Sequence, residues 1–122
     1  MVKLIVFGGR DFNDVEMLRQ AMYRFPDILT SEFVNGMCPT GADLLAREYA
    51  RSRGRKVHEF PADWDKYGKA AGPRRNAEMA KFGSVGIGFW DGKSAGTKNM
   101  IMHALQNGCE LHVYRYKAEV KE

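Results

Sequence analysis

The segment Phe89–Asn99, FWDGKSAGTKN, contains the Gly-Lys-Ser sequence that ends a phosphate-binding P-loop. Ile87 stands where a P-loop has its first glycine, so the loop that wraps a triphosphate is absent. The residues from Ser94 onward nevertheless read as the start of a helix. Exposed amides at a helix N-terminus attract phosphate or carboxylate groups. The segment therefore predicts an anion site that differs from a P-loop.

Three further segments rich in glycine and charge each follow a run that reads as a strand: GGRDF at 8–12, NGMCPTGAD at 35–43 and PADWDKYGKAAGPRRN at 61–76. Glycine lets a ligand approach the backbone closely. The candidate ligand-binding residues of the four segments are Gly8, Gly9, Arg10, Asp11, Gly36, Thr40, Gly41, Ala42, Asp43, Arg75, Asn76, Asp91, Gly92, Lys93, Ser94, Gly96 and Thr97.

Strand and helix patterns alternate between these segments. Residues 2–7 and 84–90 are apolar at nearly every position, as in strands that are buried on both faces of a parallel sheet. Shorter or alternating patterns predict strands at 32–36, 56–60 and 110–116. Helical spacing predicts helices that begin near Asn13, Thr40, Pro73 and Ala95.

Local signals refine these elements. Asn13 with Glu16, and Thr40 with Asp43, resemble capping pairs at helix starts. Two glycines that alternate in the fourth strand, Gly86 and Gly88, predict the close approach of another backbone or of a ligand.

The alternation predicts an α/β fold: a Rossmann-like three-layer sandwich with a five-stranded parallel sheet in the order 3-2-1-4-5. We expect one domain over residues 1–116 and a charged C-terminal tail at 117–122. In such sheets, ligands bind beyond the carboxyl ends of the strands, where the strand order reverses. All four glycine-bearing segments lie at this edge, so they are expected to converge.

Composition narrows the class of protein. The 122 residues carry a net charge of +4, which favours anionic partners without singling out nucleic acid. Cys38 and Cys109 are too few for a disulfide framework, and no apolar run is long enough to span a membrane. No ligand spacing for a metal is found, and no cofactor is expected. These features predict a cytoplasmic protein with no membrane partner.

Four motifs occur in a characteristic order: GGRDF, GADLLAREYA, PRRNAEMA and WDGKSAGT. In this order and spacing, the chain resembles the SLOG superfamily, specifically its small YspA-type (cpYpsA-related) Rossmann-like domains. Distant relatives are the lonely-guy phosphoribohydrolases and DNA-processing protein A. The resemblance implies a nucleotide or a nucleotide-derived, ADP-ribose-like ligand, and it implies a homo-oligomer because related domains often self-associate.

The lonely-guy enzymes carry a Gly-Gly-x-Gly-Thr loop that is soon followed by a glutamate. Gly96 and Thr97 match the Gly-Thr pair, but no glutamate follows. Asp91, Asp11 or Asp43 are possible substitutes. The arginine of the third helix in these relatives could be matched by Arg74 or by Arg75.

Three functions are compatible with the motifs. The first is a binding module that senses or sequesters the nucleotide-like ligand. The second is an enzyme that hydrolyses the N-glycosidic bond of a nucleoside monophosphate. The third is single-stranded nucleic-acid binding. It is the weakest of the three, because basic and aromatic residues do not interleave along a stripe as they do in such proteins. Trp64, Tyr67 and Trp90 are candidates to stack on a base, although packing in the core or in a lid is the commoner fate of aromatic residues.

Overall fold

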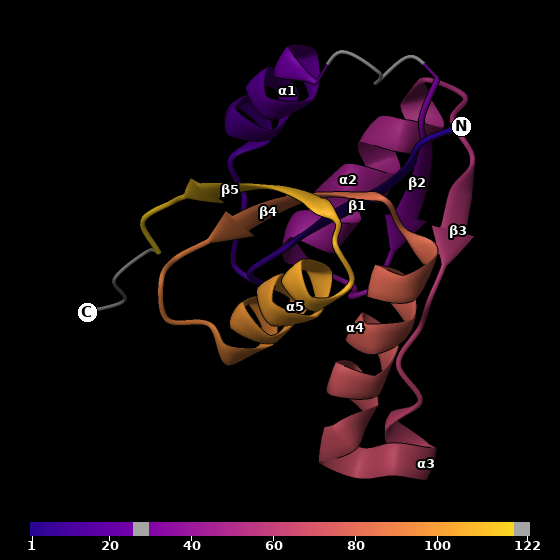
Figure 1. The fold of residues 1–122 in the computed structure, drawn as a ribbon. Helices are drawn as coiled ribbons and strands as arrows, with labels where there is room; N and C mark the ends of the chain where they lie inside the picture. The colour runs from indigo at the N-terminus through magenta and orange to yellow at the C-terminus, as the bar shows by residue number, and fades with distance from the viewer. Residues whose placement is uncertain (26–29, 119–122) are drawn as a thin grey trace.

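The computed structural model describes residues 1–25 and 30–118, which form a five-stranded parallel sheet between two layers of helices (Figure 1). The strand order is β3-β2-β1-β4-β5, so the predicted α/β sandwich and its 3-2-1-4-5 topology are confirmed. The strands are β1 (Lys3–Gly8), β2 (Glu32–Asn35), β3 (Val57–Glu59), β4 (Val85–Trp90) and β5 (Glu110–Arg115). The helices are α1 (Val15–Arg24), α2 (Gly41–Ser52), α3 (Trp64–Tyr67), η1 (Gly68–Ala70), α4 (Ala71–Phe82) and α5 (Ala95–Gln106).

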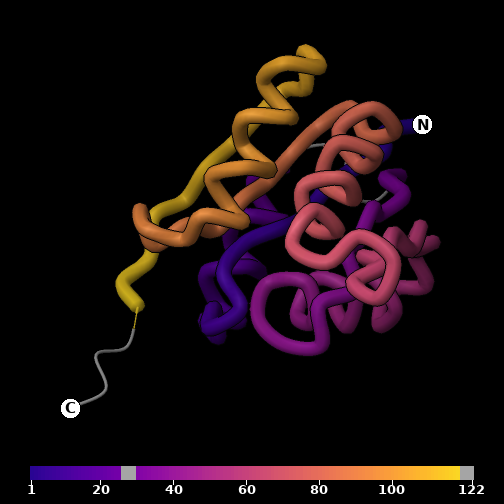
Figure 2. Tube along the Cα trace, turned by 90° about the horizontal axis from the view of Figure 1, so that it is seen from below, coloured from indigo at the N-terminus to yellow at the C-terminus, as the bar shows by residue number. Residues whose placement is uncertain are grey.

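Each face of the sheet is covered by two of the longer helices. Leu4 and Val6 of β1 pack into the core beneath α1 and α2, together with Leu18 and Ala46 from those helices. On the opposite face, α4 and α5 lie side by side (Figure 2) over a second core. Side chains alternate between the two faces of a strand, so β1 must be apolar at successive positions.

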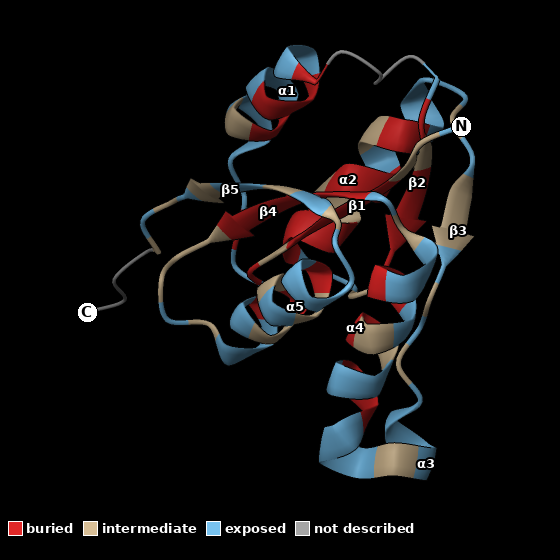
Figure 3. Cartoon of the chain, in the orientation of Figure 1, coloured by how far each residue is buried: buried red, intermediate tan, exposed pale blue. Residues whose placement is uncertain are grey.

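Burial differs between the central and the edge strands, as Figure 3 shows. In β1 and β4 the middle residues are all buried, whereas β5 is mostly exposed and β3 has no buried residue. The near-continuous apolar runs therefore correctly predicted the central positions of β1 and β4. Their pairing runs from Leu4 opposite Val85 to Gly8 opposite Phe89.

Several local expectations are corrected. The cap of α1 is Asp14, whose carboxylate accepts from the Met17 amide, so the prediction of an Asn13 cap is wrong by one residue. Helix α4 begins at Ala71, before Pro73. The proline still fits because its missing N–H would have no intrahelical partner in the first turn.

The two glycines of β4 are close to a side chain rather than to a ligand or another backbone. A methyl group on Gly88 would lie 2.5 Å from Cζ of Phe7, and one on Gly86 would lie 3.0 Å from Cδ1 of Leu111. Both glycines thus make room for core side chains, which corrects the prediction of a close ligand or backbone.

No helix in the described part of the chain is long and apolar enough to cross a membrane. The single domain expected over 1–116 stays a prediction, and residues 119–122 of the expected tail lie outside the described residues.

Candidate functional site

Loops from three strands meet at the carboxyl edge of the sheet. The Gly9 amide after β1 donates to the carbonyl of Phe89 in β4 at 3.2 Å. The Ala42 amide at the start of α2 donates to the Gly9 carbonyl at 3.2 Å. Hydrogen bonds therefore join the loops that follow β1 and β2 to the end of β4, at the point where the strand order reverses.

The N-terminus of α2 lies at this junction. Thr40 is the N-cap residue, as predicted, but its hydroxyl makes no capping bond and donates instead to the Arg10 carbonyl at 3.0 Å. Within residues 1–25 and 30–118, the amides of Gly41 and Asp43 have no protein acceptor. Unpaired amides at the positive end of a helix dipole favour an anion at this position.

Asp43 is a buried carboxyl group beside these amides, with 9% of its surface exposed. Its Oδ2 accepts from the Cys38 amide at 3.1 Å, and Oδ1 accepts no bond from any described residue. Burial raises the pKa of Asp43. The Cys38 amide and the nearby charges of Arg75, Arg47 and Arg10 oppose that rise without cancelling it.

Arg75 comes from the N-terminal half of α4 and reaches across to the loop after β2. Its Nη1 donates to the Gly36 carbonyl, and its Nε donates to Oδ1 of Asn76 at 3.0 Å. Burial lowers the pKa of Arg75, and the charge of Asp43 opposes that effect. The neighbouring Arg74 instead stacks on the ring of Tyr67 at 4.0 Å. Of the two candidate arginines, Arg75 is therefore the one that lies beside Asp43.

Asn76 connects this cluster to the start of α5. Its side chain is buried, and Nδ2 donates to Oδ1 of Asn99 at 3.0 Å and to the Gly96 carbonyl at 3.4 Å. Because Arg75 also donates to Asn76, a continuous set of hydrogen bonds runs from Gly36 to α5.

In the Gly-Lys-Ser loop before α5, several polar groups are hydrogen-bonded within the loop itself. The carboxylate of Asp91 accepts from the amides of Lys93 and Ser94, both at 2.8 Å, and these bonds lower its pKa. Ser94 caps α5 by accepting from the Thr97 amide, and Thr97 is buried. In the described part of the chain, the amides of Ala95 and Gly96 have no protein acceptor, so they remain open to a ligand.

The first loop carries two charged candidates with different surroundings. Arg10 is exposed, and its guanidinium carbon lies 5.9 Å from the ring centroid of Trp64. Asp11 accepts a hydrogen bond from the hydroxyl of Tyr116, beyond β5. Burial and that bond both raise the pKa of Tyr116. Arg10 thus remains at the rim, whereas Asp11 links the loop to the chain after β5.

Two further residues of the site were not predicted from the sequence. Arg47 is 9% exposed and donates to the Cys38 carbonyl at 2.6 Å, which holds the loop that positions Asp43. Its spacing of four residues from Asp43 on a helix was the available signal. Asn35 donates to the Asp43 carbonyl and accepts from Met37, a role with no signal in the sequence because a polar residue inside an apolar strand is ambiguous.

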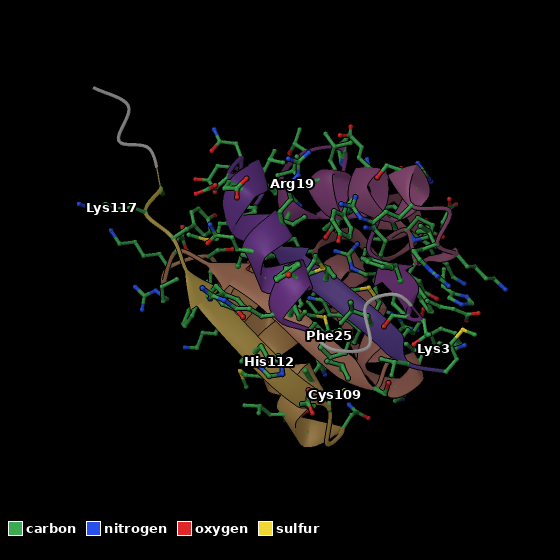
Figure 4. The ribbon with its side chains drawn as sticks, turned by 90° about the horizontal axis from the view of Figure 1, so that it is seen from above. Lys3, Arg19, Phe25, Cys109, His112 and Lys117 are labelled. Carbon is green, nitrogen blue, oxygen red and sulfur yellow. The ribbon has the colours of Figure 1, made fainter. Side chains whose placement is uncertain are left out.

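Two surface hollows lie elsewhere on the molecule. One has a volume of about 620 Å³ and is lined by residues of α1, including Arg19 and Tyr23, by Tyr49 of α2 and by Arg53, which follows α2. A smaller hollow of about 290 Å³ lies between Phe25 and His112, on the side of the molecule that Figure 4 shows. Neither contains the buried charges described above, so we place the candidate site at the carboxyl edge.

No group of three or more potential metal ligands occurs among the described residues.

A doubly wound parallel sheet in the order β3-β2-β1-β4-β5 defines a Rossmann-like α/β domain. The protein-family comparison is consistent with this class: residues 2–67, more than half of the chain, match the family YAcAr, described as "YspA, cpYpsA-related SLOG family". The chain therefore belongs to this SLOG family, as its motifs suggested. No curated protein matches it.

Proposed function

We propose that the protein binds a nucleotide or a nucleotide-derived, ADP-ribose-like molecule at the carboxyl edge of the sheet and acts as a sensing or sequestering module. Membership of the SLOG family is compatible with a nucleotide-related ligand. The observation that carries the proposal is the meeting of Arg75, Arg10 and the open amides of α2 around the buried Asp43.

These groups suit a phosphate or diphosphate. Arg75 is partly buried and has one guanidinium nitrogen, Nη2, without a hydrogen bond to any described residue. Arginine binds phosphate well because its planar group offers several donors in a fixed arrangement. The open amides of Gly41 and Gly96 would supply uncharged donors, and Lys93 would add charge at the rim.

Hydrolysis of a nucleotide N-glycosidic bond is the second candidate, and Asp43 is the observation that favours it. A buried carboxyl with a raised pKa is the type of group that acts as a general acid near neutral pH. In this reaction, Asp43 would protonate the base as the C1′–N bond breaks. Water would form the new C1′–O bond and return a proton to Asp43, while Arg75 would hold the phosphate. The free Oδ1 leaves one carboxyl oxygen available for that contact.

Thermal unfolding with and without ligand tests both functions. Adenosine 5′-monophosphate or ADP-ribose at 100 times its dissociation constant should stabilise the fold by about 2.7 kcal/mol. Arg75→Gln should lose most of this effect, because a hydrogen bond to a charged group contributes about 1.5–3 kcal/mol. Arg74→Gln is the matched control and should keep it, since Arg74 lies on Tyr67.

Chromatography of the ligand after incubation separates the two candidates. Intact nucleotide supports the binding module, and free base that is lost in Asp43→Asn supports the hydrolase. If neither ligand shifts the unfolding temperature, or if Arg74→Gln and Arg75→Gln behave alike, the proposed site is wrong.

A further inference from the structure

Three aromatic side chains are candidates to stack on a base, and each has an arginine near its ring. The ring of Tyr67 is covered by the Arg74 guanidinium, whose central carbon lies 4.0 Å from the ring centroid. Trp90 donates from Nε1 to the Ser94 carbonyl at 3.1 Å and has Arg115 over its ring at 5.6 Å. Both rings are only half-exposed, and the polar edge of Trp90 is already hydrogen-bonded.

Trp64 differs from both. It is the first residue of α3, a short helix that lies at the far end of the molecule in Figure 1, and 49% of its surface is exposed. Its indole Nε1 makes no hydrogen bond to any described residue. Tryptophan is enriched at binding interfaces because it combines a large apolar ring with a polar N–H edge.

The orientation of the Trp64 ring is supported from α4. A methyl group added to Gly72 would lie 3.2 Å from Cη2 of Trp64, so the outer edge of the indole rests against the first turn of that helix. Asp63 fixes the start of α3 by accepting from the Lys66 amide at 3.1 Å. The ring is thus held at its edge while about half of the residue's surface, 49%, stays exposed.

Arg10 connects this ring to the proposed phosphate site. Its guanidinium carbon lies 5.9 Å from the Trp64 ring centroid, and its charge acts on both Asp43 and Arg75. A nucleotide is complementary to this arrangement. Its anionic phosphate would face the arginines, and its aromatic base would face the indole. We propose that the Trp64 indole is the stacking surface for the base of the bound nucleotide, whose phosphate lies against Arg10 and Arg75. This inference rests on the proposed function.

Calorimetric titration with two probes tests the stacking. Adenosine 5′-monophosphate carries a base, and ribose 5-phosphate carries the same phosphate and sugar without one. Stacking of a base on an aromatic side chain should make the first bind roughly 5- to 150-fold more tightly than the second. Trp64→Ala should remove this ratio and leave the affinity for ribose 5-phosphate unchanged. Trp64→Phe should retain much of the ratio.

Tyr23→Ala, which removes an exposed aromatic residue of α1, is the control and should change neither affinity. Unfolding temperatures of all variants establish that they fold. If ribose 5-phosphate binds but the base adds nothing, or if Trp64→Ala weakens both probes equally, the stacking proposal fails while the phosphate site stands. If neither probe binds to the wild-type protein, the proposed function and the stacking proposal both fail.

Discussion

The starts of α2 and α5 both lie at the carboxyl edge, and both contain glycine, yet they are built differently. At α2 the surroundings are charged and buried: Asp43 is 9% exposed and Arg75 reaches in from α4. At α5 the loop is closed mainly by its own residues, with Asp91 accepting from Lys93 and Ser94. The Gly-Lys-Ser sequence, which most resembles a phosphate loop, therefore uses two of its amides internally.

The glycines at the two helix starts also differ, because packing explains one of them and not the other. Gly41 has φ of +72°, and a methyl group there would lie 2.2 Å from the Gly9 carbonyl oxygen, so packing alone requires glycine. Around Gly96, no atom would lie within 4 Å of an added methyl group. Because packing does not explain Gly96, its place beside two open amides makes it the more informative candidate for ligand contact.

The largest effect is expected from Gly41→Ala. The clash with the backbone of the first loop and the left-handed φ should together destabilise the fold by about 2–4 kcal/mol. Gly54→Ala is the matched control, because Gly54 has φ of +66° but no atom near an added methyl group. It should cost only about 1 kcal/mol. Denaturant unfolding measures both variants, and equal losses would contradict the proposed contact between α2 and the first loop.

The buried Asp43 carboxyl at α2 predicts a pH dependence of ligand binding that the α5 loop would not produce. Since the pKa of Asp43 is raised, its protonated form persists to higher pH than usual, and an anion binds best to that form. Affinity for ribose 5-phosphate should therefore fall by about tenfold as pH rises through that pKa. The titration of the phosphate group itself is common to both proteins, so the fall should appear as a declining ratio of the wild-type affinity to that of Asp43→Asn as pH rises. A ratio that stays constant would assign the titration to another group.

At α5, removal of the Asp91 carboxylate should destabilise the fold less than Gly41→Ala does. Asp91→Ala leaves the amides of Lys93 and Ser94 without their carboxylate and should lower the unfolding temperature by roughly 3 °C near neutral pH. The pKa of Asp91 is lowered in the fold, so its contribution is present above the ordinary carboxyl pKa and is lost as pH falls through the folded value. Wild type and variant should converge in acid. A constant difference at all pH values would show that the carboxylate charge is irrelevant.

The smallest expected change in stability is that of Gly96→Ala. Alanine is the better helix former in the first turn, and the space is open, so the fold should gain about 0.5–1 kcal/mol. The added methyl group would stand beside the open amides of Ala95 and Gly96, so affinity for adenosine 5′-monophosphate should fall several-fold. Thermal unfolding and titration of the same variant measure both effects. A more stable protein with unchanged affinity would restrict the ligand to the α2 side.

The elements could be predicted because their signals are local. The apolar runs of β1 and β4 indicate burial on both faces, and the alternation of β5 indicates an edge, so these patterns suffice to predict the strand order. The cap of α1 was missed by one residue because Asn13 and Asp14 are both good capping residues, and only the backbone selects between them.

The amino-acid sequence alone determined the α/β class, the order of the strands and the edge at which the glycine-rich loops gather, since hydrophobic periodicity and chain topology suffice for these. The tertiary structure decided that Arg75 and not Arg74 turns toward Asp43, and that Thr40 bonds to another loop rather than capping its helix. It also decided which backbone amides at the starts of α2 and α5 already donate to protein acceptors. These outcomes depend on contacts such as that of Arg75 with Gly36, 39 residues apart, and on burial, neither of which any short stretch of sequence encodes.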